Sequence, residues 1–273
     1  MVGSGAAAGV FGSLLGLGGG VLIVPLLTLG FGLPLREAVG VSLVSVIMTS
    51  SAAAGVYLER HVANLRLGMT LELFTATGAL IGGSIAFLLD DRVLAFAFAG
   101  LLVYVAISMI RSSTAETATA DDVDRTPEAS EPSAIAATAG SIVGDLSGPG
   151  YRVGRLKVGV VGSIGAGIAS ALLGIGGGTI KVPLMHLVMG VPIRVATATS
   201  NLMIGITASA SAVIYLFRGE IDPFVAGPTA IGVFMGATLG SRLAHRVDLR
   251  VLRLLFVAVL LYTALQMLLR AVR

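Results

Sequence analysis

Two stretches of this chain share one unusual pattern: residues 16–25 read GLGGGVLIVP, and residues 174–183 read GIGGGTIKVP. Three adjacent glycines oppose a continuous helix, because each costs up to about 1 kcal/mol relative to alanine. In each stretch a proline, Pro25 or Pro183, follows the last glycine by five residues and removes one more backbone donor. Both stretches therefore predict a broken apolar helix, with the two prolines as hinges.

The two stretches lie 158 residues apart, and the same offset aligns most of the chain without a gap. About 37 of the 102 positions from 8 to 109 are identical to the residue 158 places later. Shared apolar bias alone would give far fewer identities, so this is an internal duplication. We predict two homologous tandem repeats, 1–111 and 152–273, joined by a flexible acidic linker, 112–151, rich in Ser, Thr, Ala and Pro.

The composition predicts an all-α polytopic membrane protein. Hydrophobic residues make up 55% of the 273 residues and charged residues only 12%, against about 25% in ordinary globular chains, and the mean hydropathy is +0.95. A soluble fold cannot cover its surface with so few charges. The net charge of +3 does not indicate nucleic-acid binding, because most Lys and Arg residues stand in short loops beside apolar segments.

Each repeat holds four apolar segments, about eight in total, and most approach the ~20 residues that cross a ~30 Å bilayer core. The segments are 4–30, 38–58, 67–89, 93–110, 156–190, 195–217, 224–244 and 251–269. The fifth is too long for one simple crossing, so it must tilt, extend beyond the membrane, or break and turn. If the first segment of each repeat is a re-entrant hairpin, the repeats are inverted; if it crosses fully, they are parallel. The distribution of Lys and Arg between the two faces favours inversion.

Duplicated membrane halves are typical of secondary transporters, whose substrate site lies between the repeats at broken helices. A break at membrane depth must line a cavity or be buried in protein, and its exposed backbone N–H groups suit an anion. The alternative role for the glycines is close helix crossing. The predicted anion-binding backbone comprises Gly18, Gly19, Gly20, Gly176, Gly177, Gly178 and Thr179.

Lys181 stands three residues past the second glycine run, where the first repeat has Ile23. An ionisable residue inside a membrane segment is a functional candidate, so Lys181 is a candidate counter-charge for the anion. The alternative is that the segment ends here and the ammonium reaches the membrane surface.

Small polar residues recur after the proline loops. Ser42 and Ser200 are partners at the 158-residue offset, and Asn201 follows; we predict that these three side chains donate to the anion, with helix packing as the alternative. Glu72 is the one acid well inside an apolar segment. It is a candidate for ion coupling, although the sequence favours an interfacial position for its carboxylate.

The chain offers no reactive constellation. It contains no cysteine and three histidines, and it lacks the common nucleotide-binding and metalloprotease motifs. We therefore predict a protein that is not an enzyme and that holds no cofactor and no metal.

The doubled GxGGGxxxVP motif is followed in each repeat by a P-x-R-x-A loop, residues 34–38 and 192–196, and then by a serine-bearing helix. In these features the chain resembles the TauE/SafE sulfite exporter family, also described as toluene-sulfonate uptake permeases. The resemblance covers both repeats and implies a plasma-membrane carrier of small sulfur-containing anions, such as sulfite or organosulfonates, coupled to a proton or another cation. A passive anion channel and a membrane binding protein without flux remain alternatives. The expected partners are the small anion, the coupling ion, membrane lipid and, for a homo-oligomer, further copies of the chain.

Overall fold

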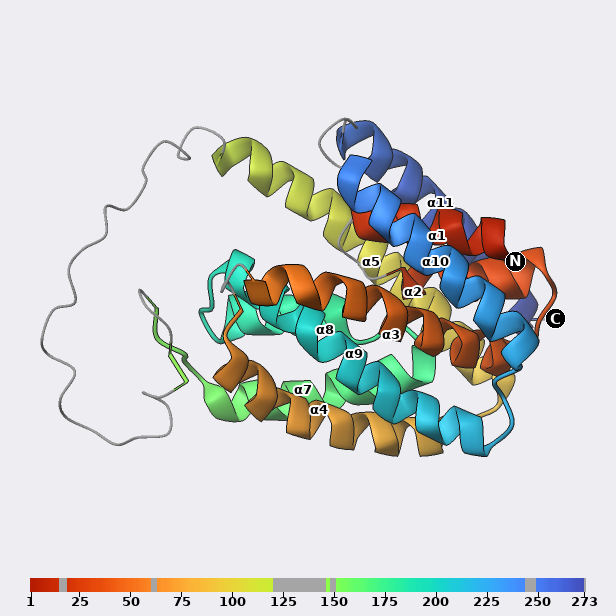
Figure 1. Cartoon of the computed structure of the whole chain (residues 1–273), viewed down its shortest axis with the longest axis horizontal. Helices are drawn as coiled ribbons and strands as arrows, with labels where there is room; N and C mark the ends of the chain where they lie inside the picture. Colours follow the sequence, from red (N-terminus) through yellow and green to blue (C-terminus); the bar gives the residue numbers. More distant parts are fainter. Residues whose placement is uncertain (15–18, 60–62, 120–145, 148–150, 244–248, 273) are drawn as a thin grey trace, which may run out of the picture.

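The computed structural model describes residues 1–14, 19–59, 63–119, 146–147, 151–243 and 249–272. Within these ranges the chain forms helices and no β-strand (Figure 1). The α-helices are α1 (Val2–Leu14), α2 (Gly20–Pro25), α3 (Leu35–Glu59), α4 (Leu65–Ala86), α5 (Asp91–Thr119), α7 (Leu156–Leu173), α8 (Gly178–Pro183), α9 (Ile193–Phe217), α10 (Pro223–Leu243) and α11 (Leu249–Val272), and the π-helices are η1 (Leu26–Gly30) and η3 (Leu184–Val188).

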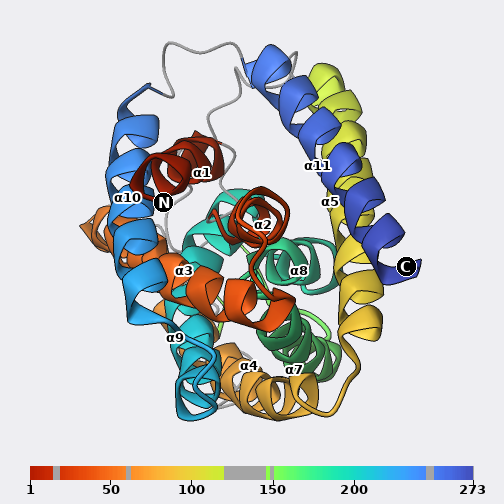
Figure 2. The same cartoon turned by 90° about the vertical axis from the view of Figure 1, so that its right-hand side faces the viewer.

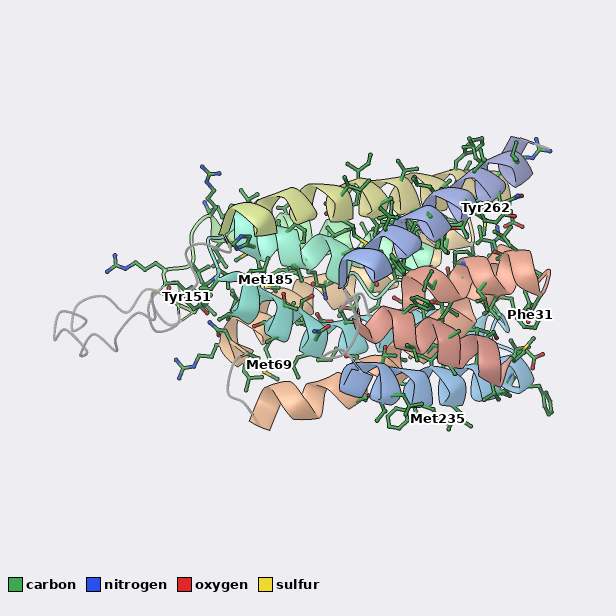
Figure 3. The ribbon with its side chains drawn as sticks, turned by 90° about the horizontal axis from the view of Figure 1, so that it is seen from above. Phe31, Met69, Tyr151, Met185, Met235 and Tyr262 are labelled. Carbon is green, nitrogen blue, oxygen red and sulfur yellow. The ribbon has the colours of Figure 1, made fainter. Side chains whose placement is uncertain are left out.

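Six helices in the described ranges are long and apolar enough to cross a membrane. They contain the segments Leu35–Ala52, Leu65–Ala86, Asp91–Ile110, Leu156–Leu173, Val195–Phe217 and Pro223–Gly240. Their outer faces carry large apolar side chains, among them Met69 at 71% exposure and Met235 at 54% (Figure 3). Such a surface suits lipid rather than water, so the chain is a multi-pass membrane protein.

The helix bounds repeat at the offset found in the sequence. Helix α2 begins at Gly20 and α8 at Gly178, 158 residues later, and the same interval separates both ends of η1 from η3 and of α3 from α9. Duplicated stretches thus adopt the same local structure, including the change from α-helix to π-helix directly after each hinge proline. Proline lacks a backbone N–H, so the α-helical ladder is interrupted there.

Helices α3 and α9 pack against each other in opposite directions. Gly40, near the start of α3, lies against the backbone carbonyl of Glu220, just beyond the end of α9. Further along α3, Ser50 Oγ donates a hydrogen bond of 2.6 Å to the carbonyl of Asn201, near the start of α9. The two helices therefore run antiparallel (Figure 1).

The long apolar segment 156–190 breaks and turns back. Helix α7 ends at Leu173, a glycine turn follows, and α8 with η3 returns the chain to the end where α7 began. The backbone N–H of Gly154, just before α7, donates to the carbonyl of Met189, just after η3, at 3.0 Å. Of the three possibilities that the sequence allows, the structure thus shows the broken hairpin. Figure 1 shows the N-terminus and the start of α3 at the same end of the molecule. Helices α1 and α2 therefore turn back as α7 and α8 do.

Glycines allow two helix pairs to approach closely. In the α1–α10 pair, Gly9 lies against the carbonyl of Val233; in the α4–α7 pair, Gly78 lies against the carbonyl of Ile164. A side chain at either glycine would overlap the neighbouring backbone. This is the packing that small residues provide inside membranes.

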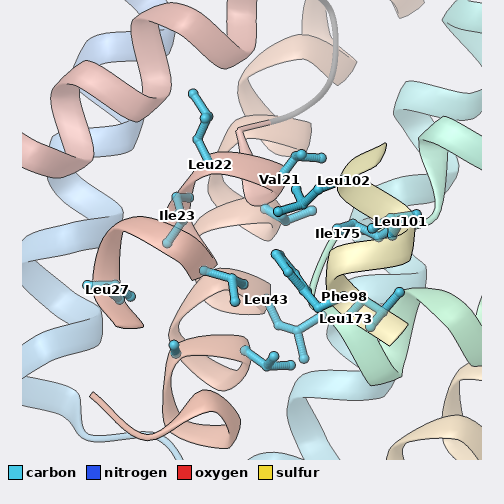
Figure 4. Packing of buried hydrophobic residues seen from close by; sticks show 14 of the residues in the cluster. Val21, Leu22, Ile23, Leu27, Leu43, Phe98, Leu101, Leu102, Leu173 and Ile175 are labelled. Carbon is cyan, nitrogen blue, oxygen red and sulfur yellow. The ribbon is translucent and has the colours of Figure 1, made fainter. Parts of the chain in front are cut away.

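The short helices α2 and α8 lie in the interior, with the longer helices around them (Figure 2). All six residues of α2 are buried. Its side chains Val21 and Ile23 belong to one apolar cluster with Phe98 of α5 and Ile175 of the second glycine turn (Figure 4). Of the described backbone at the breaks, Gly19, Gly20 and residues 174–177 are buried in protein, as irregular backbone at membrane depth must be.

Most of the predicted linker 112–151 lies outside the described residues. At one end of it, α5 continues to Thr119. At the other end, Asn64 Nδ2 donates to the carbonyl of Leu146 at 2.9 Å and to the hydroxyl of Tyr151 at 2.7 Å. The flexibility of the linker stays a prediction.

Candidate functional site

The second glycine stretch forms a tight turn between α7 and α8. Gly174, Gly176 and Gly177 have φ angles of 67°, 74° and 77°, a left-handed conformation that glycine adopts without strain. Neighbouring side chains also exclude a larger residue here, because a Cβ on Gly176 would lie 2.5 Å from Ile204 Cγ2 and 2.7 Å from Val46 Cγ1. Gly177 is the residue before α8, and its carbonyl accepts the backbone N–H groups of Ile180 and Lys181.

The first glycine stretch meets the second. Gly19, the equivalent of Gly177, has φ 76° and precedes α2, whereas Gly18 lies outside the described residues. Ser42 Oγ of α3 contacts the carbonyl of Gly20 at 3.2 Å and that of Gly174 at 2.7 Å. One buried hydroxyl thus bridges the two breaks.

A buried ion pair lies directly behind the second break. Lys181 Nζ donates to Glu72 Oε2 at 2.8 Å and to Thr207 Oγ1 at 2.6 Å, and Thr207 Oγ1 donates to Glu72 Oε1 at 2.6 Å. The side chains of Lys181 and Glu72 are 1% and 5% exposed. The three residues belong to α8, α4 and α9, so this cluster joins the returning hairpin to two membrane-spanning helices.

The structure decides two of the alternatives that the sequence leaves open. Lys181 does not reach the membrane surface, because its whole side chain is buried. The interfacial position favoured for Glu72 is wrong: Glu72 is 4% exposed and lies inside the helix assembly. Sequence spacing could not pair these residues, since 109 positions separate them and only the packing of α8 beside α4 and α9 brings them together.

Three buried hydroxyls around the second break have no hydrogen-bond partner within the described part of the chain: those of Ser170 of α7, Thr179 of α8 and Ser200 of α9. The hydroxyl of Ser163, earlier on α7, likewise has none there. A Cβ on Gly177 would lie 3.4 Å from Ser170 Cβ and 3.5 Å from Lys181 Cε, and a Cβ on Gly178 would lie 3.6 Å from Ser200 Oγ. Ser170, Ser200 and Lys181 therefore border the same short stretch of glycine backbone.

An unpartnered buried hydroxyl costs about 1–3 kcal/mol, so native proteins rarely leave several together without a reason. A group of hydroxyl donors beside an ammonium suits an anion, because each donor can point its hydrogen at negative charge. Ser163 and Ser170 were missed by sequence reasoning, whereas Thr207 belongs to the small polar residues that recur at the 158-residue offset, where its partner is Thr49. Serines are common packing residues of membrane helices, and nothing in the spacing of Ser163 and Ser170 distinguishes them.

The charged cluster occurs in one half only. At the 158-residue offset, Lys181 corresponds to Ile23 and Glu72 to Ala230, whereas Thr207 keeps its hydroxyl as Thr49. The two halves therefore share their backbone pattern, but they differ in charge at the breaks.

Asn201 lies half-buried beside this region, and its backbone carbonyl accepts the hydroxyl of Ser50. The role of its side-chain amide as an anion donor stays a prediction. Among the residues that the structure describes, no three His, Asp or Glu side chains gather in a way that could hold a metal ion.

Comparisons with known proteins show that the chain is similar to membrane transporters. The model of the sulfite exporter TauE/SafE family matches residues 1–267. The probable membrane transporter protein YunE of Bacillus subtilis (strain 168) is 24% identical over 270 residues, which cover 96% of this chain and 94% of YunE. A probable membrane transporter protein of Xylella fastidiosa (strain 9a5c) is 28% identical over 268 residues, 96% of this chain and 92% of its own length.

The chain also matches 43% of the longer probable membrane transporter protein MamO of Paramagnetospirillum magneticum, with 28% identity over 279 residues. No solved structure matches the chain. Because the family model extends over both halves and both glycine breaks, the chain belongs to the sulfite exporter TauE/SafE family.

Proposed function

We propose that this protein is a secondary transporter, a permease or exporter, of small sulfur-containing anions such as sulfite or organosulfonates. The family name and the membrane-transporter relatives support the class of protein and of solute. A carrier driven by an ion gradient needs a membrane that maintains one, so we assign it to the plasma membrane.

The observation that carries the proposal is the buried ammonium of Lys181 beside unpartnered hydroxyls at a glycine break. A charge inside a membrane protein is costly and is generally retained for function. We propose that the anion binds at the second break, with Lys181 as counter-charge and with Ser170, Thr179 and Ser200 as hydroxyl donors. The backbone of Gly176–Gly178 would leave room for it, because these positions carry no side chain.

We further propose that the two halves are inverted repeats related by a pseudo-twofold axis in the membrane plane. Three observations support this arrangement: the helix bounds correspond at an offset of 158 residues, α3 and α9 are antiparallel, and the α7–α8 hairpin returns to its own side. Inverted repeats are a common basis of alternating access. Since Lys181 is enclosed, the anion would reach it when the hairpins move relative to the flanking helices.

The proposal is tested by flux in proteoliposomes. Purified protein is reconstituted, and uptake of sulfite and of methanesulfonate is followed with and without an imposed pH gradient. We expect saturable uptake that responds to the gradient, and loss of that uptake in Lys181→Met, because the anion then lacks its counter-charge.

Circular dichroism and gel filtration establish that the variant is folded, which matters because Lys181→Met leaves Glu72 without its partner. The variant Gly100→Ala serves as a control: a Cβ at this position meets no atom within 4 Å, so uptake should be unchanged. Unitary currents in a planar bilayer would show that the protein is a passive channel and would overturn the carrier mechanism. Absence of both fluxes from folded wild-type protein would overturn the sulfur-anion assignment.

A further inference from the structure

We propose that the transported anion and the carboxylate of Glu72 compete for Lys181, so that each anion enters together with one proton that neutralises Glu72. The inference rests on the proposed anion site and names its coupling ion, the residue that carries it and the stoichiometry. The protein would then be a proton–anion symporter.

The charge balance of the buried cluster leads to this mechanism. In the described conformation, the ammonium of Lys181 and the carboxylate of Glu72 form an ion pair with no net charge. An added anion would leave one uncompensated negative charge in a region shielded from water, which is strongly disfavoured. If Glu72 takes up a proton, the ammonium and the anion form the new neutral pair. No electron is transferred, and no covalent bond changes apart from the O–H bond at Glu72.

The hydrogen bonds show how the pair can exchange partners. Lys181 Nζ and Thr207 Oγ1 each donate to one oxygen of Glu72, so both oxygens of the carboxylate are engaged. Once Glu72 is protonated, its attraction for Lys181 falls, and Lys181 can turn toward the anion at the break. Thr207 also has an alternative acceptor, the Met203 carbonyl at 3.2 Å, so its proton is not left unpaired.

No other described charge replaces Lys181 in this role. Glu72 forms its ion pair with Lys181 and accepts a hydrogen bond from Thr207. Helix α4 packs against α7 and α9. The described basic residue of α7, Lys157, is exposed at its first turn, and Arg218 lies just past the far end of α9, over the ring of Phe87. His186 of η3 is engaged with the carbonyl of Val191 at 2.9 Å.

The asymmetry between the halves sets the stoichiometry. At the 158-residue offset the first half has Ile23 and Ala230 in place of Lys181 and Glu72. One exchangeable ion pair therefore serves both half-sites, and one proton accompanies each anion. For a monovalent anion the combined movement is electrically neutral.

The direct test is the number of protons taken up when an anion binds. Methanesulfonate is the probe, since its own charge does not change near neutral pH. Binding to the full chain in detergent is measured by calorimetry at pH 7 in two buffers with different heats of ionisation. We expect uptake of about one proton per anion in the wild type and none in Glu72→Gln, whose amide has the size of the carboxylate and keeps one acceptor oxygen but cannot ionise.

A matched pair of variants separates the cluster from its equivalent in the first half. Thr207→Val removes the hydroxyl that holds Glu72, so we expect the affinity for methanesulfonate and the proton uptake to change together. Thr49→Val makes the same substitution at the equivalent position, where the hydroxyl donates to the Val46 carbonyl. This variant should keep the wild-type affinity and the wild-type proton uptake.

Flux completes the test. Wild-type uptake of methanesulfonate should increase with an inward proton gradient and should not change with membrane potential. Uptake by Glu72→Gln should change with membrane potential and not with pH. Binding or flux without proton uptake in the wild type overturns the coupling mechanism and leaves the carrier intact. Absence of both binding and flux overturns the proposed function itself. If Glu72→Gln does not fold, the number of protons taken up by the wild type still tests the coupling mechanism. Glu72→Asp, which keeps the charge, should keep the proton uptake.

Discussion

At the scale of single residues, Ser42 and Ser200 show how equivalent positions can have different tasks. Both are buried serines, one on α3 and one on α9, and 158 residues separate them. Ser42 Oγ contacts two carbonyls of the glycine breaks, whereas Ser200 Oγ has no partner within the described ranges. We infer that the first hydroxyl stabilises the packing of the two breaks, and that the second serves the proposed anion site.

This difference predicts opposite effects of the same substitution. Ser42→Ala should lower the free energy of unfolding by about 1–3 kcal/mol, because buried carbonyls lose their donor. Ser200→Ala should raise the free energy of unfolding by up to about 1–3 kcal/mol, because it removes a buried hydroxyl that has no partner within the described ranges, but should raise the KM for the anion about tenfold, through loss of roughly 1.4 kcal/mol of binding. Thermal unfolding in detergent and uptake kinetics measure the two effects. Equal destabilisation with unchanged KM values would remove Ser200 from the site.

At the scale of elements, glycines bring the backbones of two helix pairs, α1–α10 and α4–α7, close together. Gly78 and Gly82 of α4 lie one turn apart, and both face the backbone of α7. Because lipid is as apolar as a leucine side chain, burial of apolar surface drives helix association weakly inside a bilayer, and close packing contributes more. Among the 37 glycines of the chain, Gly9 and Gly78 thus lie where helices touch, and Gly176 lies where a helix breaks.

Substitution of helix glycines should accordingly depend on what each one faces. Gly78→Ala would push a methyl group into the Ile164 carbonyl and should destabilise by about 1–3 kcal/mol through overpacking. Gly100→Ala on α5 meets open space and should stabilise by up to about 1 kcal/mol through helix propensity. Denaturation of the two variants in the same detergent provides the comparison, and the expectation fails if both shift stability in the same direction.

At the scale of the whole molecule, the arrangement of the two halves determines which loops share a side of the membrane. Helices α3 and α9 begin after equivalent loops, but they run in opposite directions. The loop at Pro34 and the loop at Pro192 should therefore face opposite compartments. In parallel repeats they would face the same one.

Because the chain contains no cysteine, this topology can be tested with single substitutions. Both Pro34 and Pro192 are exposed, so Pro34→Cys and Pro192→Cys should each react with a membrane-impermeant maleimide, but from opposite sides of sealed vesicles. Permeabilised vesicles, in which both should react, provide the control. Labelling of both positions from the same side would contradict inverted repeats.

The sequence by itself determined the class of the molecule and its internal pattern. Few charges and long apolar segments require a membrane, and the doubled glycine motif locates the breaks because glycine runs act locally on the backbone wherever they occur. Helix type is local in the same sense, so the bounds of α3 and α9 follow the apolar segments within a few residues. Lys181 and Ser200 could also be named as candidates, Lys181 because a charge is rare inside an apolar segment, and Ser200 because it is the partner of Ser42 at the 158-residue offset.

Only the tertiary structure decided which of these groups meet. Glu72 and Lys181 are 109 positions apart on different helices, and no periodicity in the chain relates them. Their pairing depends on how α4 and the returning α8 both pack against α9, which is a property of the packed assembly. The unpartnered state of Ser170 is likewise a matter of three-dimensional surroundings: the same serine on another helix face would be an ordinary packing residue. Local backbone preferences act over a few residues and can be recognised in a single sequence, whereas electrostatic pairing and hydrogen-bond satisfaction depend on neighbours that folding brings together.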